Sequence, residues 1–259
     1  MTNDADLRDR RRFLRYVTHI FGTVPLLGRW SRATATDIKV SRGKLPFDYE
    51  IVPGAEAADR ISALRKRESC VPVVLGEPSR LATLASLLRS NGSFDETKRK
   101  GLALDVDKWI RDRRASDPDY YIADGPLTGV ELVEPLTSVR DVLSGTYLPK
   151  VAIALCRVTE PWEVAAVLRP GGWNDCPDST VHLAFFKRWY ELYGAVVTSM
   201  TDDVIEFTVA HPPKSPQQAT RLAEEQFVYC ADIVHQGVNS IRNLAAILTS
   251  ANNWYFWWD

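Results

Sequence analysis

The chain has 259 residues, a formal net charge of −1 and 25% charged side chains. This balance argues against a general nucleic-acid-binding protein, which usually carries a basic excess. Four cysteines without a CxxC pair predict neither a disulfide framework nor a standard zinc module. No apolar run approaches the roughly 20 residues of a membrane-spanning helix. We therefore expect a reduced, soluble, cytoplasmic globular protein.

Residues 1–36 form a basic N-terminal arm. Residues 1–32 contain seven arginines and three aspartates, a local net charge of +4. Apolar residues at helical spacing predict an amphipathic helix packed on the body of the protein: Phe13, Val17, Ile20, Phe21 and Val24. Residues 10–15 also resemble a twin-arginine export signal, with ATA at 33–35 as its cleavage site. Export and a membrane-surface helix remain the alternatives.

Residues 37–128 alternate between predicted strands and helices, which indicates an α/β N-terminal domain. Residues 37–54 are predicted to be extended, 55–67 helical, VPVVLG (71–76) a buried strand, and 77–89 a helix. The sequence from about 90 to 128 is polar and is predicted to be irregular. We place the domain boundary within it, between residues 115 and 130.

Residues 129–259 are predicted to form a C-terminal α+β domain. Strands are expected at 150–158, 195–200, 204–210 and 254–258, and helices at 178–193, 215–237 and 240–250. Asp178 or Ser179 and then Ser215 are expected to cap the first two helices, which end at Gly194 and Gly237. The order β-α-β-β-α-α-β matches a ferredoxin-like two-layer sandwich, whose last strand pairs beside its first.

The chain ends on WYFWWD, residues 254–259. In a strand, Trp254, Phe256 and Trp258 share one face, which we expect to pack on the helix that contains Phe185 and Trp189. The opposite face carries Tyr255 and Trp257, which need a cover. We expect the N-terminal half of the chain to provide it; a second copy or a partner are the alternatives.

Three stretches, GGWNDCP (171–177), EEQFVYCADIVHQG (224–237) and the terminal WYFWWD, resemble the bacterial domain-of-unknown-function family 4253. The resemblance covers about residues 129–259, and residues 51–76 are similar to the region that often precedes the domain. The family implies no established activity. The bacterial contexts of its members suggest interaction or toxin-immunity roles.

The GGWNDCP loop has two interpretations. It presents Trp173, Asn174 and Asp175 to a ligand, or it is a rigid turn whose tryptophan fills the core. Cys176 would be a nucleophile only if His182 or His235 lay beside it. The pairs Cys176/His182 and Cys230/His235 do not have the spacing of familiar zinc modules.

The helix that follows carries Gln226 within its apolar stripe and several polar residues beside it. The polar stripe, which includes Glu225, Asp232 and Gln236, is typical of a solvated helix face, although paired acids also serve in catalysis or metal binding. The chain has no phosphate-binding glycine loop, HExxH or GxSxG motif.

We expect a non-enzymatic interaction module of the immunity or antitoxin kind, without metal or cofactor, that binds a partner protein such as a toxin. The candidate binding residues are Trp173, Asn174, Asp175, Glu225, Gln226, Asp232, Gln236, Tyr255 and Trp257. One alternative is an enzyme with a polar pocket around Trp173, Asn174, Asp175, Glu225 and Asp232. A sensor of a small ligand or nucleotide is the other alternative.

Overall fold

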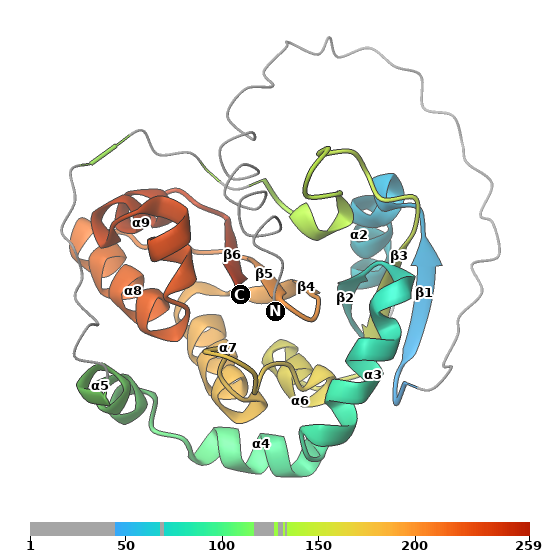
Figure 1. Ribbon diagram of the computed structural model, residues 1–259, viewed down its shortest axis with the longest axis horizontal. Coiled ribbons are helices and arrows are strands. Elements are labelled where there is room, and N and C mark those ends of the chain that lie inside the picture. The colour runs from blue at the N-terminus through green and yellow to red at the C-terminus, as the bar shows by residue number, and fades with distance from the viewer. Residues whose placement is uncertain (1–44, 68–69, 117–126, 129–131, 133) are drawn as a thin grey trace, which may run out of the picture.

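The computed structural model describes residues 45–67, 70–116, 127–128, 132 and 134–259 (Figure 1). The predicted N-terminal arm, residues 1–36, lies outside the described residues. Expectations about an arm helix, an export signal or a membrane-surface helix therefore stay predictions.

One mixed sheet of six strands runs through the described part of the chain, in the order β1-β3-β2-β4-β5-β6. The strands are β1 (Asp48–Val52), β2 (Val71–Gly76), β3 (Val151–Cys156), β4 (Val196–Met200), β5 (Val204–Thr208) and β6 (Asn253–Trp257). β2 and β4 pair in parallel, and every other neighbouring pair is antiparallel. An α+β fold is confirmed.

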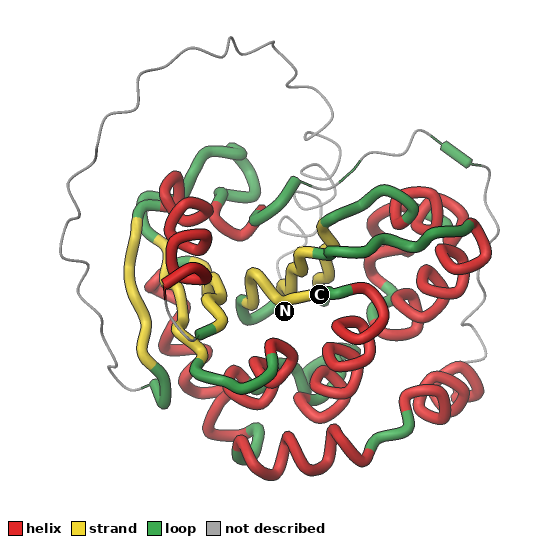
Figure 2. The backbone as a smooth tube through the Cα atoms, turned by 180° about the vertical axis from the view of Figure 1, so that it is seen from behind, coloured by secondary structure: helices red, strands yellow, loops and turns green. Residues whose placement is uncertain are grey.

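Helices lie on both sides of this sheet (Figures 1 and 2). The α-helices are α2 (Ala57–Arg67), α3 (Leu81–Ser90), α4 (Phe94–Ala103), α5 (Val106–Ser116), α6 (Val164–Leu168), α7 (Ser179–Tyr193), α8 (Pro216–Tyr229) and α9 (Ile241–Leu248). Short 3₁₀ segments are η2 (Gly54–Glu56), η3 (Pro78–Arg80), η4 (Thr137–Val139) and η5 (Pro161–Glu163), and η6 (Ile233–Val238) is a π-helix.

The two faces of the sheet are covered to different extents. On one face, a large core joins all the strands to α6, α7, α8 and α9. On the other, a smaller core under α2 and η4 involves only β1, β3 and β2. β3 is buried on both sides, because Ala152 and Ala154 face the large core while Val151 and Ile153 face the small one. The rest of this second face is formed by β4, β5 and β6. There, Ser199 of β4 pairs with Glu206 of β5, and Glu206 pairs with Tyr255 of β6.

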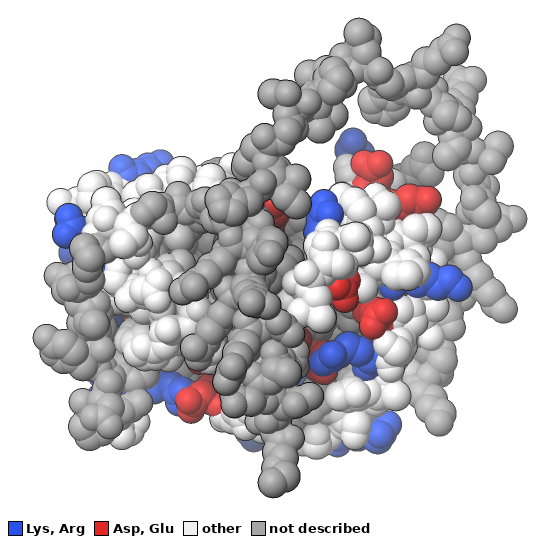
Figure 3. Space-filling view, turned by 45° about the horizontal axis from the view of Figure 1, so that its top comes forward, with Lys and Arg blue, Asp and Glu red and all other residues white. Residues whose placement is uncertain are grey.

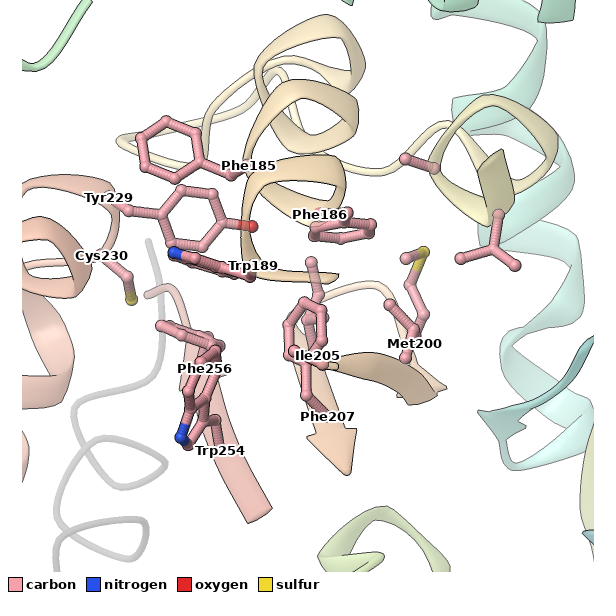
Figure 4. Packing of buried hydrophobic residues seen from close by; sticks show 14 of the residues in the cluster. Phe185, Phe186, Trp189, Met200, Ile205, Phe207, Tyr229, Cys230, Trp254 and Phe256 are labelled. Carbon is pink, nitrogen blue, oxygen red and sulfur yellow. The ribbon is translucent and has the colours of Figure 1, made fainter. Parts of the chain in front are cut away.

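The terminal strand behaves as predicted on its inner face. Trp254 and Trp258 are buried, and the Trp254 ring lies 5.6 Å from that of Trp189 in α7. Figure 4 shows Trp189 between Tyr229 and Phe256, which it approaches at centroid distances of 4.9 and 5.3 Å. Aromatic burial of this extent secures the end of the chain against fraying.

The ferredoxin-like strand order is not found. β6 pairs with β5 and not with β3, and β2 lies between β3 and β4. The physical reason is that β2, a nearly continuous apolar run, needs cover on both faces and obtains it in the middle of the sheet. Strands from both sides of the predicted boundary at residues 128–129 thus share one sheet.

Helix caps follow the predictions more closely than helix extents do. Asp178 accepts the first-turn N–H groups of Thr180 and Val181, and Ser215 accepts that of Gln218. The helix predicted over 215–237 ends at Tyr229 instead, because Cys230 is extended and its thiol donates to the carbonyl of Trp257 at 3.0 Å. The expectation of irregular structure from 90 to 116 is wrong.

That error has a simple cause. α4 buries only Thr97 and Gly101, and α5 has no fully buried residue. Gly101 allows the close approach to α7, since a Cβ there would lie 2.7 Å from the Leu183 side chain. α4 therefore offers little apolar periodicity to detect, whereas Val106, Trp109 and Ile110 in α5 have a helical apolar spacing that the prediction overlooked.

Candidate functional site

The GGWNDCP loop is a tight, internally bonded turn. Gly171 and Gly172 have φ of +82° and +81°, and the Gly172 N–H donates to the carbonyls of Cys176 and Pro177. A Cβ on Gly171 would lie 1.7 Å from the carbonyl oxygen of Pro177. Asn91, at the end of α3, donates to the carbonyls of Arg169 and Gly171 at 2.9 and 3.0 Å. The loop is therefore held rigidly against the body.

The tip of this loop meets the end of the chain. Trp173 is half-buried against the large core, whereas Asn174 and Asp175 are exposed. The backbone of Asn174 has a φ of +46°, and its side-chain amide donates to the Asp259 carbonyl at 2.7 Å. The Asp259 N–H donates to Asp232 at 3.3 Å, and Gln236 donates to the same carboxylate at 3.0 Å. We call Trp173, Asn174, Asp175, Asp232, Gln236 and Asp259 the loop surface.

Negative charge gathers at this surface. Burial raises the pKa of Asp232, and the charges of Asp259 and Asp175 raise it further, against the hydrogen bonds from Gln236 and the Asp259 N–H. Asp175 is 87% exposed at its side chain and has Arg113 at 3.4 Å. An arrangement of this kind attracts a cationic group.

Beneath the loop lies a buried chain of polar side chains. The Cys176 thiol is 3.5 Å from Nε2 of His182, whose Nδ1 is 2.5 Å from the Tyr229 hydroxyl. Burial lowers the pKa of His182 to about 3 and raises that of Cys176. The Tyr229 pKa is likewise raised by burial.

These pKa shifts determine whether Cys176 and His182 can take part in catalysis. A nucleophilic cysteine needs a lowered pKa and access to substrate. Cys176 is 6% exposed and His182 is fully buried, so the pair stays neutral at ordinary pH. The structure does bring Cys176 and His182 together, but as a packed hydrogen-bonded core group.

The remaining cysteine and histidine pair is not associated with it. His235 is exposed and meets the Phe227 ring edge to face, at a centroid distance of 5.1 Å, while the Cys230 thiol donates to the carbonyl of Trp257. In the described residues no three His, Cys, Asp or Glu side chains are grouped to hold a metal ion.

Glu225 and Gln226 are separate from the loop surface. Glu225 accepts Nε1–H of Trp189 at 2.6 Å and Nε–H of Arg188 at 3.0 Å. Burial raises its pKa, and the charge of Arg188 opposes that rise. Gln226 is 1% exposed, and its amide nitrogen has no hydrogen-bond partner among the described groups. Glu225 thus joins α8 to α7, and Gln226 is a buried residue of α8.

Tyr255 and Trp257 lie on the opposite face of β6, with ring centroids 5.4 Å apart. They line a cleft of about 310 Å³ at the carboxyl ends of β2 and β4, the parallel pair in the sheet. Open sheets with parallel strands commonly bind ligands at such a place. We call this volume the β2–β4 cleft. Its lining is Gly76, Glu77, Arg80, Thr137, Ser138, Arg140, Asp141, Val142, Leu143, Leu148, Thr201, Asp202, Asp203, Val204, Tyr255 and Trp257.

A buried carboxylate supports the cleft wall. Glu206 of β5 is 3% exposed and accepts from the backbone and hydroxyl of Thr137 at 2.7 and 2.6 Å, and from Ser138. Ser138 also donates to Ser199 at 2.5 Å. Burial raises the pKa of Glu206, against these hydrogen bonds, which favour the charged form. Glu206 thereby fastens η4 to the face of the sheet that carries Ser199 and Glu206.

Sequence reasoning missed this cleft. Its polar residues follow the apolar strand VPVVLG as GEPSR and the strand AVVTSM as TDD. The second segment is a hairpin turn, as predicted, and Thr201 accepts the Val204 N–H within it. The detectable signal was a glutamate in the middle of VIEFTVA, where a charge requires buried partners.

Charges elsewhere are mixed. On the face that Figure 3 shows, acidic and basic side chains of the described residues alternate without an expanse of one sign. No helix in the described part of the chain combines the length and the apolar character that crossing a membrane requires.

Residues 152–259 match the family model described as "Domain of unknown function (DUF4253)". The match confirms the resemblance carried by GGWNDCP, EEQFVYCADIVHQG and WYFWWD, and it begins at residue 152 rather than near 129. No curated protein and no solved structure matches the chain significantly. The C-terminal part of this chain, residues 152–259, is therefore similar to the domains that this family model describes.

Proposed function

We propose that this protein is a non-enzymatic binding module that recognises a partner protein through the loop surface. One observation carries the proposal: the three stretches typical of the family converge there. Asn174 comes from GGWNDCP, Asp232 and Gln236 follow α8, and Asp259 ends WYFWWD. A surface assembled from three distant segments, and held by a rigid loop, is suited to recognition.

The chemistry of the loop surface favours a basic partner. Trp173 is half-buried in the same loop as Asp175, and the charges of Asp175 and Asp259 both act on Asp232. A central aromatic anchor with charged groups at its rim is a common arrangement in protein interfaces. Lysine or arginine side chains of the partner would pair with the carboxylates, and association would weaken with salt.

Binding rather than catalysis is favoured by the groups beneath the loop. Cys176 and His182 are buried and neutral, and Glu225 is engaged by Trp189 and Arg188 at a distance from Asp175. The polar pocket that the enzymatic alternative requires would need Glu225 beside the loop.

We further propose that the partner is a toxin and that the chain acts as its immunity or antitoxin protein in the cytoplasm. The bacterial contexts of the family favour this role. The four cysteines, none of which is in a disulfide, fit a reducing compartment.

The test is photo-crosslinking in cells. The full chain carries p-benzoyl-phenylalanine in place of Asp175, and a matched protein carries it in place of Leu192, which is 56% exposed on α7. A partner captured from position 175 but not from position 192, and lost in a Trp173→Ala background, supports binding at the loop surface. Equal capture at both positions, or none at 175, contradicts it.

The toxin role has its own test. The captured protein, expressed alone, should arrest growth, and co-expression of the full chain should restore it. Trp173→Ala and Asp175→Arg variants should fail to restore growth while keeping the wild-type thermal transition. A harmless partner would leave the binding proposal standing and remove the immunity role.

A further inference from the structure

The β2–β4 cleft has a chemistry that calls for a basic, partly apolar occupant. Among its described lining residues are four acids, Glu77, Asp141, Asp202 and Asp203, and two arginines, Arg80 and Arg140. Arg80 pairs with Asp202 and lies 3.9 Å from Asp203, and Arg140 stacks on Tyr147 with its guanidinium 3.9 Å from the ring centroid. The cleft therefore keeps an acidic excess.

One carboxylate oxygen in the cleft receives no hydrogen bond from the described residues even when Arg80 and Asp202 are paired. Oδ1 of Asp202 is buried and has no hydrogen-bond partner among the described atoms, although Oδ2 accepts from Arg80. A buried carboxylate oxygen without a donor destabilises the protein, because it has lost its hydrogen bonds to water without a replacement. A cationic N–H donor would remove that cost.

The lip of the cleft is apolar and exposed. Val142 and Leu143 lie in a turn that Asp141 holds by accepting the Leu143 and Ser144 N–H groups at 3.2 and 2.8 Å. Their exposed fractions are 38% and 69%, which is high for side chains of this kind on a constrained turn. Carboxylates beside apolar side chains match an amphipathic segment that carries arginines.

The same chain contains such a segment. Residues 7–24 hold Arg8, Arg10, Arg11, Arg12 and Arg15 against Asp9, together with the helical apolar stripe that begins at Phe13. The described chain begins at Leu45, next to β1 at the far edge of the sheet. Residues 25–44 extend to about 65 Å, whereas six strands are only about 24 Å across, so the segment reaches the cleft.

We propose that the basic N-terminal segment, residues 7–24, docks in the β2–β4 cleft of its own chain. Its arginines pair with the cleft carboxylates, Asp202 among them. Its apolar stripe covers Val142 and Leu143, the exposed apolar side chains at the lip of the cleft. The interaction is separate from the loop surface, so it does not depend on the proposed partner.

A crosslinking probe in the full chain tests this docking. p-Benzoyl-phenylalanine replaces Leu143, and the matched control carries it at Leu192. Mass spectrometry of the digested protein then locates each link. We expect the probe at 143, but not at 192, to join residues 7–24 while the protein migrates as a monomer.

Charge variants test the chemistry. Substituting Arg10, Arg11 and Arg12 by Glu should lower the yield of the link from position 143 about tenfold, the effect of losing one or two ion pairs. Adding Glu77→Arg and Asp202→Arg should restore a measurable part of it. Each variant is first checked for a wild-type thermal transition, and Glu77→Arg alone serves if Asp202→Arg does not fold.

Five outcomes overturn the proposal: a link from 143 to another segment, no link, a crosslinked dimer, a link to a different protein, or a yield that the three glutamates leave unchanged. A crosslinked dimer would mean that the cleft binds the N-terminal segment of a second copy of the chain. A link to a different protein would assign it to a basic partner.

Discussion

His182 makes a quantitative prediction about stability and pH. Its ring is fully buried between Tyr229, Phe186 and Trp258, at centroid distances of 5.4, 5.8 and 5.6 Å. Burial lowers its pKa from 6.5 to about 3, and the nearby charge of Asp178 opposes that shift. The folded protein therefore resists taking a proton that the unfolded chain accepts.

The sign follows from linkage. Between pH 6.5 and pH 3 the unfolded state binds more protons at this site, so acidification lowers the free energy of unfolding. Above pH 6.5 the imidazole is neutral in both states and its full contribution is present. One pKa unit corresponds to about 1.4 kcal/mol, so acidification to pH 4.5 should remove roughly 3 kcal/mol through His182 alone.

The assay is urea unfolding at pH 7.5 and pH 4.5. Carboxylates also titrate in this range, so the informative quantity is the pH-induced change in wild type minus that in His182→Gln. We expect a difference of roughly 3 kcal/mol. Phe207→Leu, which removes a buried ring of the same core but no titratable group, should change stability equally at both pH values.

Equal pH dependence in wild type and His182→Gln would refute the reasoning. It would mean that the imidazole is protonated as easily in the folded protein as in water. Cys176 would then sit beside a titrating histidine, and the argument against a nucleophilic cysteine would lose its main support.

Three further substitutions test the packing around the site, each by chemical unfolding. Gly171→Ala should cost more than about 3 kcal/mol because its Cβ meets Pro177, whereas Gly145→Ala, also at positive φ but in open space, should cost only about 1 kcal/mol; similar costs would contradict the crowding argument. Gln226→Met should stabilise the protein by about 1 kcal/mol, since it removes a buried donor without a described partner; destabilisation would show that the amide is bonded. Glu225→Ala should cost about 2–3 kcal/mol and Asp112→Ala, in an exposed pair with Lys108, less than 1 kcal/mol; a small loss at Glu225 would place it in solvent.

Sequence reasoning identified most elements because their signals are local. VPVVLG, KVAIALCRV and VIEFTVA are strands by apolar content alone, and Asp178, Ser215 and Gly194 mark helix ends by cap chemistry. The position of each strand in the sheet is not a local property. β2 separates β3 from β4 because of burial on both faces, and no residue spacing within residues 129–259 announces an inserted strand from outside.

The candidate site was predicted in part for the same reason. Asn174, Asp232 and Gln236 belong to motifs that the resemblance had already singled out, and the structure brings them together through Asp259. Glu225 lies in the same helical stripe, yet it turns to Trp189 and Arg188. The β2–β4 cleft was missed because its walls come from four segments that are polar, short and far apart in sequence.

β6 joins the two proposed binding regions. Its inner face, Trp254 and Phe256, completes the core with α7, so substitutions there act on folding. Its outer face presents Tyr255 to the β2–β4 cleft, and the chain that continues from it ends on Asp259 at the loop surface. Because the strand is only five residues long and pairs on one edge with β5, a shift of its outer face would also move the residue that Asn174 holds. A substitution at Tyr255 should therefore affect only the β2–β4 cleft, and one at Asn174 only the loop surface, as long as the inner aromatic face of β6 stays packed.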